Sequence, residues 1–381
     1  MSDIIIYIMA AFAVLGAIDK LLGNRFGLGK QFDEGICTCA PLALSMVGIL
    51  VLAPVLAQVL EPVVVPVYEF FGADPAMFAG TILANDMGGA PLAQALARSE
   101  EAANFGGLIV SAMMGTTVVF IIPTALGIVE EADKQYVATG VLAGLVTIPV
   151  GSLVGGLLAG YSVGMIIRNL VPIILFAVVV ALGLWRFQSA IIKGFTWFGK
   201  FVVAVVTLGL AVGILQALTD VVILPQAAPV GEGFAIVGEI AIVLAGAFPL
   251  VHVITKVFRK PLMKLGKWMG MNDVSAAGLV ASLANSIPVF GILKYMDNRG
   301  KVVNMAFAVS ATAVFGDHLG FTAGMNDEMI VPVVIGKLVG GVTAVLVALW
   351  ITRSWGNSVG GFSTNSKTET ERAVEGSVEK A

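Results

Sequence analysis

Residues 72–89 read GADPAMFAGTILANDMGG, and residues 270–288 read GMNDVSAAGLVASLANSIP. In both stretches Ala-Gly stands seven and eight residues after the first glycine, and Leu-Ala-Asn follows. Paired hydrophobic segments that are interrupted by Gly, Pro and polar residues at matching positions of two halves indicate a transporter's binding site. Unwound backbone is tolerated at membrane depth only where it is buried in protein or lines a cavity. The two stretches therefore predict a carrier whose broken helices face its substrate.

Composition independently predicts an all-α, polytopic integral membrane protein. The chain is 58% hydrophobic and only 12% charged, about half the charged fraction of a typical soluble domain. Apolar runs of about 20 residues recur, and each is long enough to cross a bilayer. The net charge of −3 and the lack of a basic block give no sign of a nucleic-acid partner. Cys37 and Cys39 lack a metal-like partner set, and neither a metal site nor a cofactor is expected.

The apolar runs predict a series of full spans and leave two interrupted segments, 75–97 and 274–294, to be placed. The full spans are expected at 3–22, 36–60, 104–128, 136–160, 165–185, 197–218, 233–255, 303–324 and 330–352. The N-terminus lacks the basic region and cleavage site of a signal peptide. The first span is therefore expected to be retained.

If both interrupted segments are re-entrant hairpins, the positively charged loops fall on one side of the membrane. The loops that share this side are 19–34, 186–200, 256–272 and 294–301, together with the C-terminal tail. The loops on the other side contain no Lys or Arg and are 61–74, 219–232 and 325–329. The positive-inside rule therefore favours two hairpins, an outside N-terminus and an inside C-terminus.

This topology gives the two halves opposite orientations, which predicts inverted repeats. Further echoes support the repeat, since Pro54 and Pro249 hold similar places and the LVGG of 153–156 recurs at 338–341. The expected division is a first membrane repeat, a linking span and loop, a second membrane repeat and a cytoplasmic tail, at 1–162, 163–194, 195–353 and 354–381. The tail is rich in Ser, Thr, Glu and Lys without apolar periodicity, which is typical of disorder.

Ionisable residues inside the predicted spans are the first candidates for the chemistry, because burying one at a helix centre is costly. Asp86 lies in the first break, and Asp317 and His318 lie inside the apolar run 303–324. Asp86 either binds a cation or caps broken backbone, and Asp317 either binds a cation or is satisfied locally. His318 either shuttles protons or is a packing histidine that hydrogen-bonds Asp317.

Polar side chains around the two breaks complete the candidate binding set. Asn85, Asn285 and Ser286 either bind substrate or cap the broken helices. The remaining candidates are Thr116, Met87 and Glu34. The alternative for Thr116 is a hydrogen bond back to its own helix, for Met87 it is packing, and for Glu34 it is an interfacial position. Lys337 stands about one turn into the final span, where it is expected to reach the membrane surface or pair with an acid.

An ordered series of short stretches gives the chain a family resemblance across residues 1–352. The stretches are QFDEG at 31–35, PVYE at 66–69, MFAGT at 77–81, DMGG at 86–89, LANSIP at 283–288, NRGKV at 298–302, GDHLGF at 316–321 and GKLVGG at 336–341. In these the chain resembles the ethanolamine permeases of the ethanolamine-utilisation system, the EutH family. It departs from the expected pattern at Ala90-Pro91 and at Ser286, which bears on selectivity.

The resemblance implies a permease, not an enzyme, that carries ethanolamine into the cytoplasm across a bacterial cytoplasmic (inner) membrane. Asp86 or Asp317 would then pair with the ammonium group, and Asn85, Asn285 or Ser286 would bind the hydroxyl. Two alternatives from other classes are a cation or proton antiporter and the membrane subunit of an ion-pumping decarboxylase. The sequence leaves open whether transport is passive or ion-coupled, and whether the carrier is a monomer or a homodimer.

Overall fold

The computed structural model describes residues 2–219 and 221–355, and every regular element in that part of the chain is a helix. Eight helical stretches among the described residues are long and apolar enough to cross a membrane. They are Ile4–Leu21, Leu28–Phe70, Glu100–Ile128, Glu131–Leu158, Val163–Leu184, Ser189–Leu218, Val230–Val257 and Asp327–Ile351. The prediction of an all-α polytopic membrane protein is confirmed. The predicted tail, apart from its first two residues, lies outside the described residues.

The helices of the first half include several short ones that flank the first break. They are α1 (Ser2–Leu21), α2 (Leu28–Cys37), α3 (Cys39–Leu42), α4 (Gly48–Phe70), α5 (Ala76–Ile82), α6 (Gly89–Leu96), α7 (Glu100–Asn104), α8 (Ile122–Ile128), α9 (Lys134–Leu145) and α10 (Ile148–Leu158). Two π-helical stretches, η3 (Phe105–Gly115) and η4 (Thr117–Ile121), continue α7 into α8 without an unwound segment. A 3-10 turn, η2 (Asn85–Met87), lies inside the first break.

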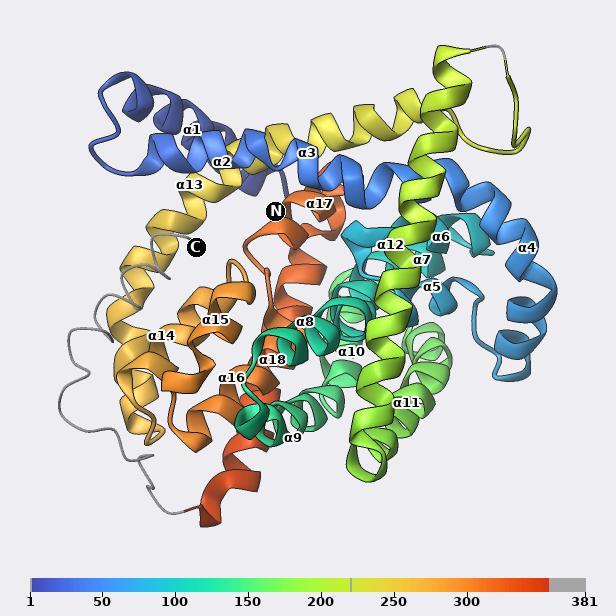
Figure 1. Cartoon of the computed structure of the whole chain (residues 1–381). Helices are drawn as coiled ribbons and strands as arrows, with labels where there is room; N and C mark the ends of the chain where they lie inside the picture. Colours follow the sequence, from blue (N-terminus) through green and yellow to red (C-terminus); the bar gives the residue numbers. More distant parts are fainter. Residues whose placement is uncertain (1, 220, 356–381) are drawn as a thin grey trace.

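The remaining helices form the link and the second half. They are α11 (Val163–Arg186), α12 (Gln188–Leu218), α13 (Val230–Trp268), α14 (Asp273–Ser282), α15 (Ile287–Ile292), α16 (Asn298–Ala311), α17 (Asp317–Met325) and α18 (Ile330–Ile351). The long helix α13 contacts α1, α2, α14 and α17 and runs along one flank of the molecule (Figure 1). It therefore connects the N-terminal helices to the second broken segment.

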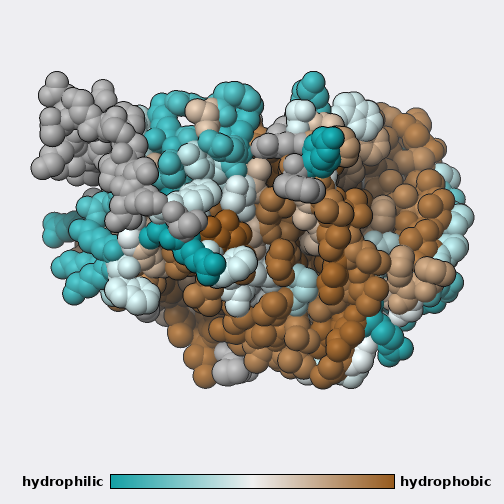
Figure 2. Space-filling view, turned by 90° about the horizontal axis from the view of Figure 1, so that it is seen from below, coloured by the Kyte–Doolittle hydropathy of each residue, from teal (hydrophilic) through white to brown (hydrophobic). Residues whose placement is uncertain are grey.

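The outer surface is apolar over the long helices, as a lipid-facing protein requires. Large side chains of α11 are well exposed at Leu175, Val178, Val179 and Leu182. Figure 2 shows hydrophobic residues covering much of one face, with hydrophilic residues gathered toward its margins. Contiguous exposed apolar surface of this extent marks a contact with lipid or protein.

Several predicted loop boundaries are wrong because helices continue beyond the apolar runs. The segment 256–272 was predicted as a loop, but α13 extends through its basic residues to Trp268. The predicted loop 186–200 is also mostly helical, since α12 begins at Gln188. The second span is longer than 36–60, because helical structure runs from Leu28 to Phe70. Lys, Arg and Leu are good helix formers, so a helix need not end where its apolar run ends.

The prediction of one continuous span over 303–324 is also wrong. α16 ends at Ala311, α17 begins at Asp317, and Ala313 between them has a left-handed φ of 51°. The unwound backbone donates hydrogen bonds to another segment, from the Ala313 N–H to the Ser282 oxygen at 3.0 Å and from the Phe315 N–H to the Leu283 oxygen at 2.9 Å. These bonds replace intrahelical ones, so tertiary pairing breaks the helix.

Each interrupted segment returns to the place where it began. In the first, the carboxylate of Asp74 accepts hydrogen bonds from the N–H groups of Ala76 at 2.9 Å and Arg98 at 3.1 Å. In the second, the carboxylate of Asp297 accepts from the N–H of Asn272 at 2.9 Å. These hydrogen bonds join the two ends of each segment, which are 24 residues apart in the first and 25 residues apart in the second. α5 with α6, and α14 with α15, are therefore connected as compact helical pairs.

α10 and α18 cross at glycines from the two halves. A Cβ at Gly151 would lie 2.6 Å from the carbonyl oxygen of Gly336, and a Cβ at Gly336 would lie 2.8 Å from that of Gly151. Small residues let membrane helices approach at backbone distance. The crossing places the final helix directly against the first half of the protein.

Candidate functional site

A cavity of about 280 Å³ lies where the two broken segments meet. Its lining combines acids, amide and hydroxyl groups with small apolar side chains, from Thr38, Pro41, Leu42, Ser45, Ala84, Asp86, Met87, Thr116, Phe120, Asn285, Thr312, Ala313, Asp317 and His318. Residues about 200 positions apart in the sequence therefore share one polar cavity inside an apolar protein.

The first break is held open by a neighbouring helix. Leu83 and Ala84 are extended, and Gly88 adopts a left-handed φ of 95° that restarts the helix at α6. The hydroxyl of Ser111 in η3 donates a hydrogen bond of 2.5 Å to the carbonyl oxygen of Leu83. A Cβ at Gly115 would lie only 1.8 Å from the same oxygen. Only glycine allows this approach, and the approach presents Asp86 and Met87 to the cavity.

The second break is held by its own side chains and by the unwound segment after α16. The amide oxygen of Asn285 accepts a hydrogen bond of 2.8 Å from the N–H of Ile287. The hydroxyls of Ser286 and Thr312 are 2.5 Å apart, so one donates to the other. Asn285 therefore caps the break and lines the cavity at once, while Ser286 supports Thr312, which lines it.

A fully buried lysine stands behind the cavity wall. Lys337 has no exposed surface, and its ammonium donates to the carbonyl oxygen of Ala112 at 2.5 Å and lies 2.9 Å from Nδ1 of His318. The expectation that Lys337 reaches the surface is wrong. Within the described chain no carboxylate lies within 4 Å of it, so its interaction with an acid is the longer-range one with Asp86. The ring of His318 is bonded to Lys337 and not to Asp317.

A charged lysine determines the protonation and the tautomer of the histidine beside it. An ammonium group has donors only, so a hydrogen bond from Lys337 requires Nδ1 of His318 to accept. The imidazole is then neutral and carries its proton on Nε2. Asp86 interacts electrostatically with both Asp317 and Lys337. With both acids ionised, these four side chains carry a net charge of −1.

The sequence contains a signal for the burial of Lys337. A lysine inside GKLVGG of a long apolar run meets the same burial cost that singled out the acids. Thr38 and Ser45 were also missed, although both line the cavity. Their separation of seven residues places them on one helical face. Their hydroxyls donate to the carbonyls of Gly35 and Leu42.

The other predicted residues take different positions. Asp86, Asn285, Asp317, His318, Thr116 and Met87 line the cavity. Asn85 lies behind it, fully buried, and neither amide atom has a hydrogen-bond partner among the described residues. Thr116 donates to the carbonyl of Ser111 at 3.0 Å. Glu34 is away from the cavity, where it accepts from Gln31 at 3.1 Å and remains 42% exposed.

Together, the apolar spans and the central polar cavity between two broken helices define a multi-pass membrane transporter. Residues 1–351 match the family described as "Ethanolamine utilisation protein, EutH", and the chain belongs to this family. The resemblance drawn from the short sequence stretches is thus confirmed. No solved structure matches the chain.

Named relatives cover nearly the whole chain. A protein of Listeria monocytogenes named "Probable ethanolamine permease EutH" is 62% identical over 92% of this chain and 94% of its own length. The "Probable ethanolamine permease EutH" of Escherichia coli is 46% identical over 97% of this chain and 98% of its own length. A Bacillus subtilis relative, "Uncharacterized protein YxeR", is 50% identical over 92% of this chain and 95% of its own length. The relatives from L. monocytogenes and E. coli are thus named as permeases, which is a name for transporters and not for enzymes.

Proposed function

We propose that this protein is an ethanolamine permease that carries the protonated amine into a bacterial cytoplasm. The observation that carries the proposal is the cavity that Asp86, Asp317 and Asn285 line together. Ethanolamine is a small cation with a hydroxyl group, because an amine resembling that of Lys has a pKa of about 10. The permease names of its relatives point to the same substrate.

The charge balance of the cavity favours one monovalent cation. Asp86 and Asp317 supply two negative charges and Lys337 one positive charge, so the ammonium of ethanolamine would bring the net charge to zero. A buried charge is strongly disfavoured unless it is paired. Asp86 is assigned to the ammonium, because it lines the cavity at the first break and interacts electrostatically with both Asp317 and Lys337. The amide nitrogen of Asn285 is assigned to the hydroxyl, since its oxygen is already engaged.

The proposed mechanism is alternating access within an inverted repeat, with residues 1–162 and 195–353 as the repeats and 163–194 as the link. Both broken segments would be re-entrant hairpins that enter from opposite sides and contribute to one cavity. The hydrogen bonds that join their ends and the reciprocal contact of Gly151 with Gly336 support this arrangement. The distribution of Lys and Arg supports an outside N-terminus and an inside C-terminus.

Uptake into proteoliposomes tests the transport function directly. The purified protein should give saturable uptake of radiolabelled ethanolamine at an outside pH of about 6, where unassisted entry of the neutral amine is lowest. Calorimetry should show ethanolamine binding. Imposed sodium and proton gradients then separate a uniporter from an ion-coupled carrier. A protein that exchanges cations but neither binds nor moves ethanolamine would be an antiporter, and the proposal would be wrong.

Site-directed labelling tests the topology. With Cys37 and Cys39 replaced by Ser, single cysteines at Val63, Glu100 and Gln226 should react with an impermeant reagent added outside, and a cysteine at Lys264 should react only after the membrane is opened. Reaction of Glu100→Cys and Lys264→Cys from the same side would exclude two hairpins of opposite orientation.

A further inference from the structure

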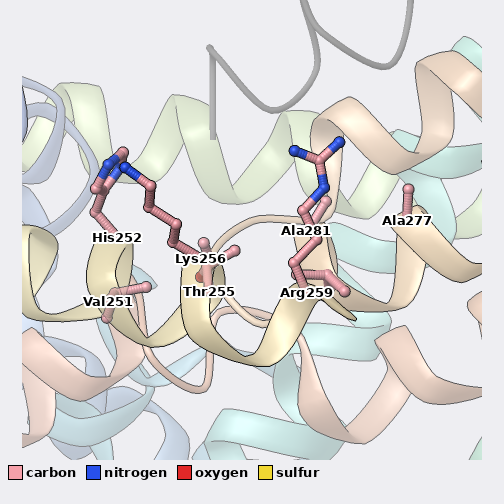
Figure 3. A pocket seen from close by; sticks show the side chains of 9 residues that line it. Val251, His252, Thr255, Lys256, Arg259, Ala277 and Ala281 are labelled. Carbon is pink, nitrogen blue, oxygen red and sulfur yellow. The ribbon is translucent and has the colours of Figure 1, made fainter. Parts of the chain in front are cut away.

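A second pocket, of about 190 Å³, lies between α13 and α14 (Figure 3). Basic side chains of α13 at positions i, i+4 and i+7 line it together with small side chains of α14 and of the turn that follows α14. The basic residues are His252, Lys256 and Arg259, and the small ones are Ala277 and Ala281 of α14 and Ala284 of the turn. The spacing on α13 puts the basic residues on a single helical face. The pocket thus has one cationic side and one apolar side.

The charge on the cationic side has no acidic partner in the described structure. Lys256 and Arg259 are exposed, and no carboxylate among the side chains that the structure describes lies within salt-bridge distance of either. Elsewhere on α13, by contrast, Lys267 pairs with Asp273 at 3.1 Å. An unneutralised pair of cations attracts an anion and repels ethanolammonium. The pocket is therefore no route for the proposed substrate.

The apolar side favours an anion that carries a hydrocarbon group. Ala277 and Ala281 are buried and Ala284 is half-buried, and these small side chains leave space along α14 and the turn that follows it. An inorganic anion gains nothing from this surface, whereas an acyl chain gains stability from each methylene that leaves water.

The depth of the pocket in the membrane is also that of a lipid headgroup. The apolar span of α13 ends at Val257, between Lys256 and Arg259. Basic residues at the end of a span lie at the level of the headgroups, where each attracts anionic lipid.

We infer that this pocket binds one anionic phospholipid, with its phosphate between Lys256 and Arg259 and an acyl chain along the alanines of α14. The lining of the pocket includes Ala284, which precedes Asn285 of the substrate cavity. A bound lipid therefore packs against the second break and stabilises it. This effect on uptake rests on the proposed transport function, but lipid binding itself does not.

Native mass spectrometry of the purified full-length protein tests the site. The protein is titrated with phosphatidylglycerol or with phosphatidylcholine. The variant Lys256→Gln/Arg259→Gln should bind phosphatidylglycerol roughly thirtyfold more weakly than the parent, because each basic residue near the headgroups contributes about a factor of five. The matched control is Lys260→Gln/Lys264→Gln, which removes two exposed positive charges from the same helix outside the pocket. It should bind nearly as the parent does.

A second variant tests the apolar side without changing the charge. Ala281→Leu should fill the pocket and reduce phosphatidylglycerol binding, while inorganic phosphate should not compete for the site. Equal lipid binding by the parent and by Lys256→Gln/Arg259→Gln would overturn the inference. Binding of inorganic phosphate that Ala281→Leu leaves unchanged would also overturn it, since the site would then take a free anion. Lost lipid binding with normal uptake would refute only the effect on transport.

Discussion

The two broken segments are stabilised in different ways. The Leu83 carbonyl of the first break is held by one side chain, Ser111, on a helix that stays wound through η3 and η4. The corresponding carbonyls of the second break, those of Ser282 and Leu283, are held by backbone N–H groups of an unwound segment. A wound helix resists deformation more than an unwound segment does. The first break is thus the rigid wall of the cavity, and the second is the side suited to movement.

The largest expected effect concerns the acid of the rigid wall. Asp86→Asn should lower ethanolamine affinity more than about 100-fold, because removing one partner of a buried charge pair costs about 3–5 kcal/mol. Calorimetry on the folded variant measures this loss. Asp317→Asn, on the movable side, should lose less affinity. If Asp317→Asn loses binding and Asp86→Asn keeps it, the assignment of the ammonium is reversed.

Lys337 links the two sides of the cavity through charge. Lys337→Met should destabilise the protein by up to about 3 kcal/mol, because the half-buried carboxylates of Asp86 and Asp317 then lack a compensating charge. The double variant Lys337→Met/Asp317→Asn restores a net charge of −1 and should recover part of this loss. A double-mutant cycle from thermal unfolding in nanodiscs measures the coupling. Strictly additive losses would show that Lys337 does not balance the charge of the acids.

Removing the side-chain hydrogen bonds at each break should destabilise the protein to different extents. Ser111→Ala leaves the Leu83 oxygen buried without its partner and should cost about 1–3 kcal/mol. Ser286→Ala/Thr312→Val removes both partners of the hydroxyl pair at the second break, which can be nearly neutral. Thermal unfolding compares the two variants. A larger loss for the double variant would contradict backbone pairing as the main support of the second break.

The smallest effect is expected at an exposed ion pair near the end of the second broken segment. A hydrogen bond with Glu130, at 3.3 Å, raises the pKa of Lys294. Because the pKa of Lys294 is raised, the contribution of this ion pair to folding stability is fully present at neutral pH and is lost as the pH rises through the folded-state pKa. Glu130→Gln should therefore lower the melting temperature slightly at pH 7 and not at strongly alkaline pH. Exposed pairs contribute little, so uptake should not change.

Local pattern predicted most of the fold and much of the candidate site. Long apolar runs must be helical in lipid, because every backbone polar group needs a partner within its segment. The echo of 72–89 in 270–288 located both breaks, and the two breaks line one cavity. Periodicity could not locate the break in 303–324, because an apolar helix and an apolar segment that pairs elsewhere have the same composition. Only the packing of distant helices brings Thr38 to the lining of the cavity and Lys337 behind its wall.

Sequence alone was enough to identify the chain as a helical membrane protein of the EutH family with two interrupted segments. The length of each apolar run and the short stretches typical of the family are local properties of the sequence. Both can be recognised without knowing which residues contact one another. Only the tertiary structure decided that Lys337 lies against His318 and Ala112, and that Ala313 and Phe315 bond to the second break. The physical reason is that a buried charge or an unwound N–H takes whichever partner the fold brings within hydrogen-bond distance.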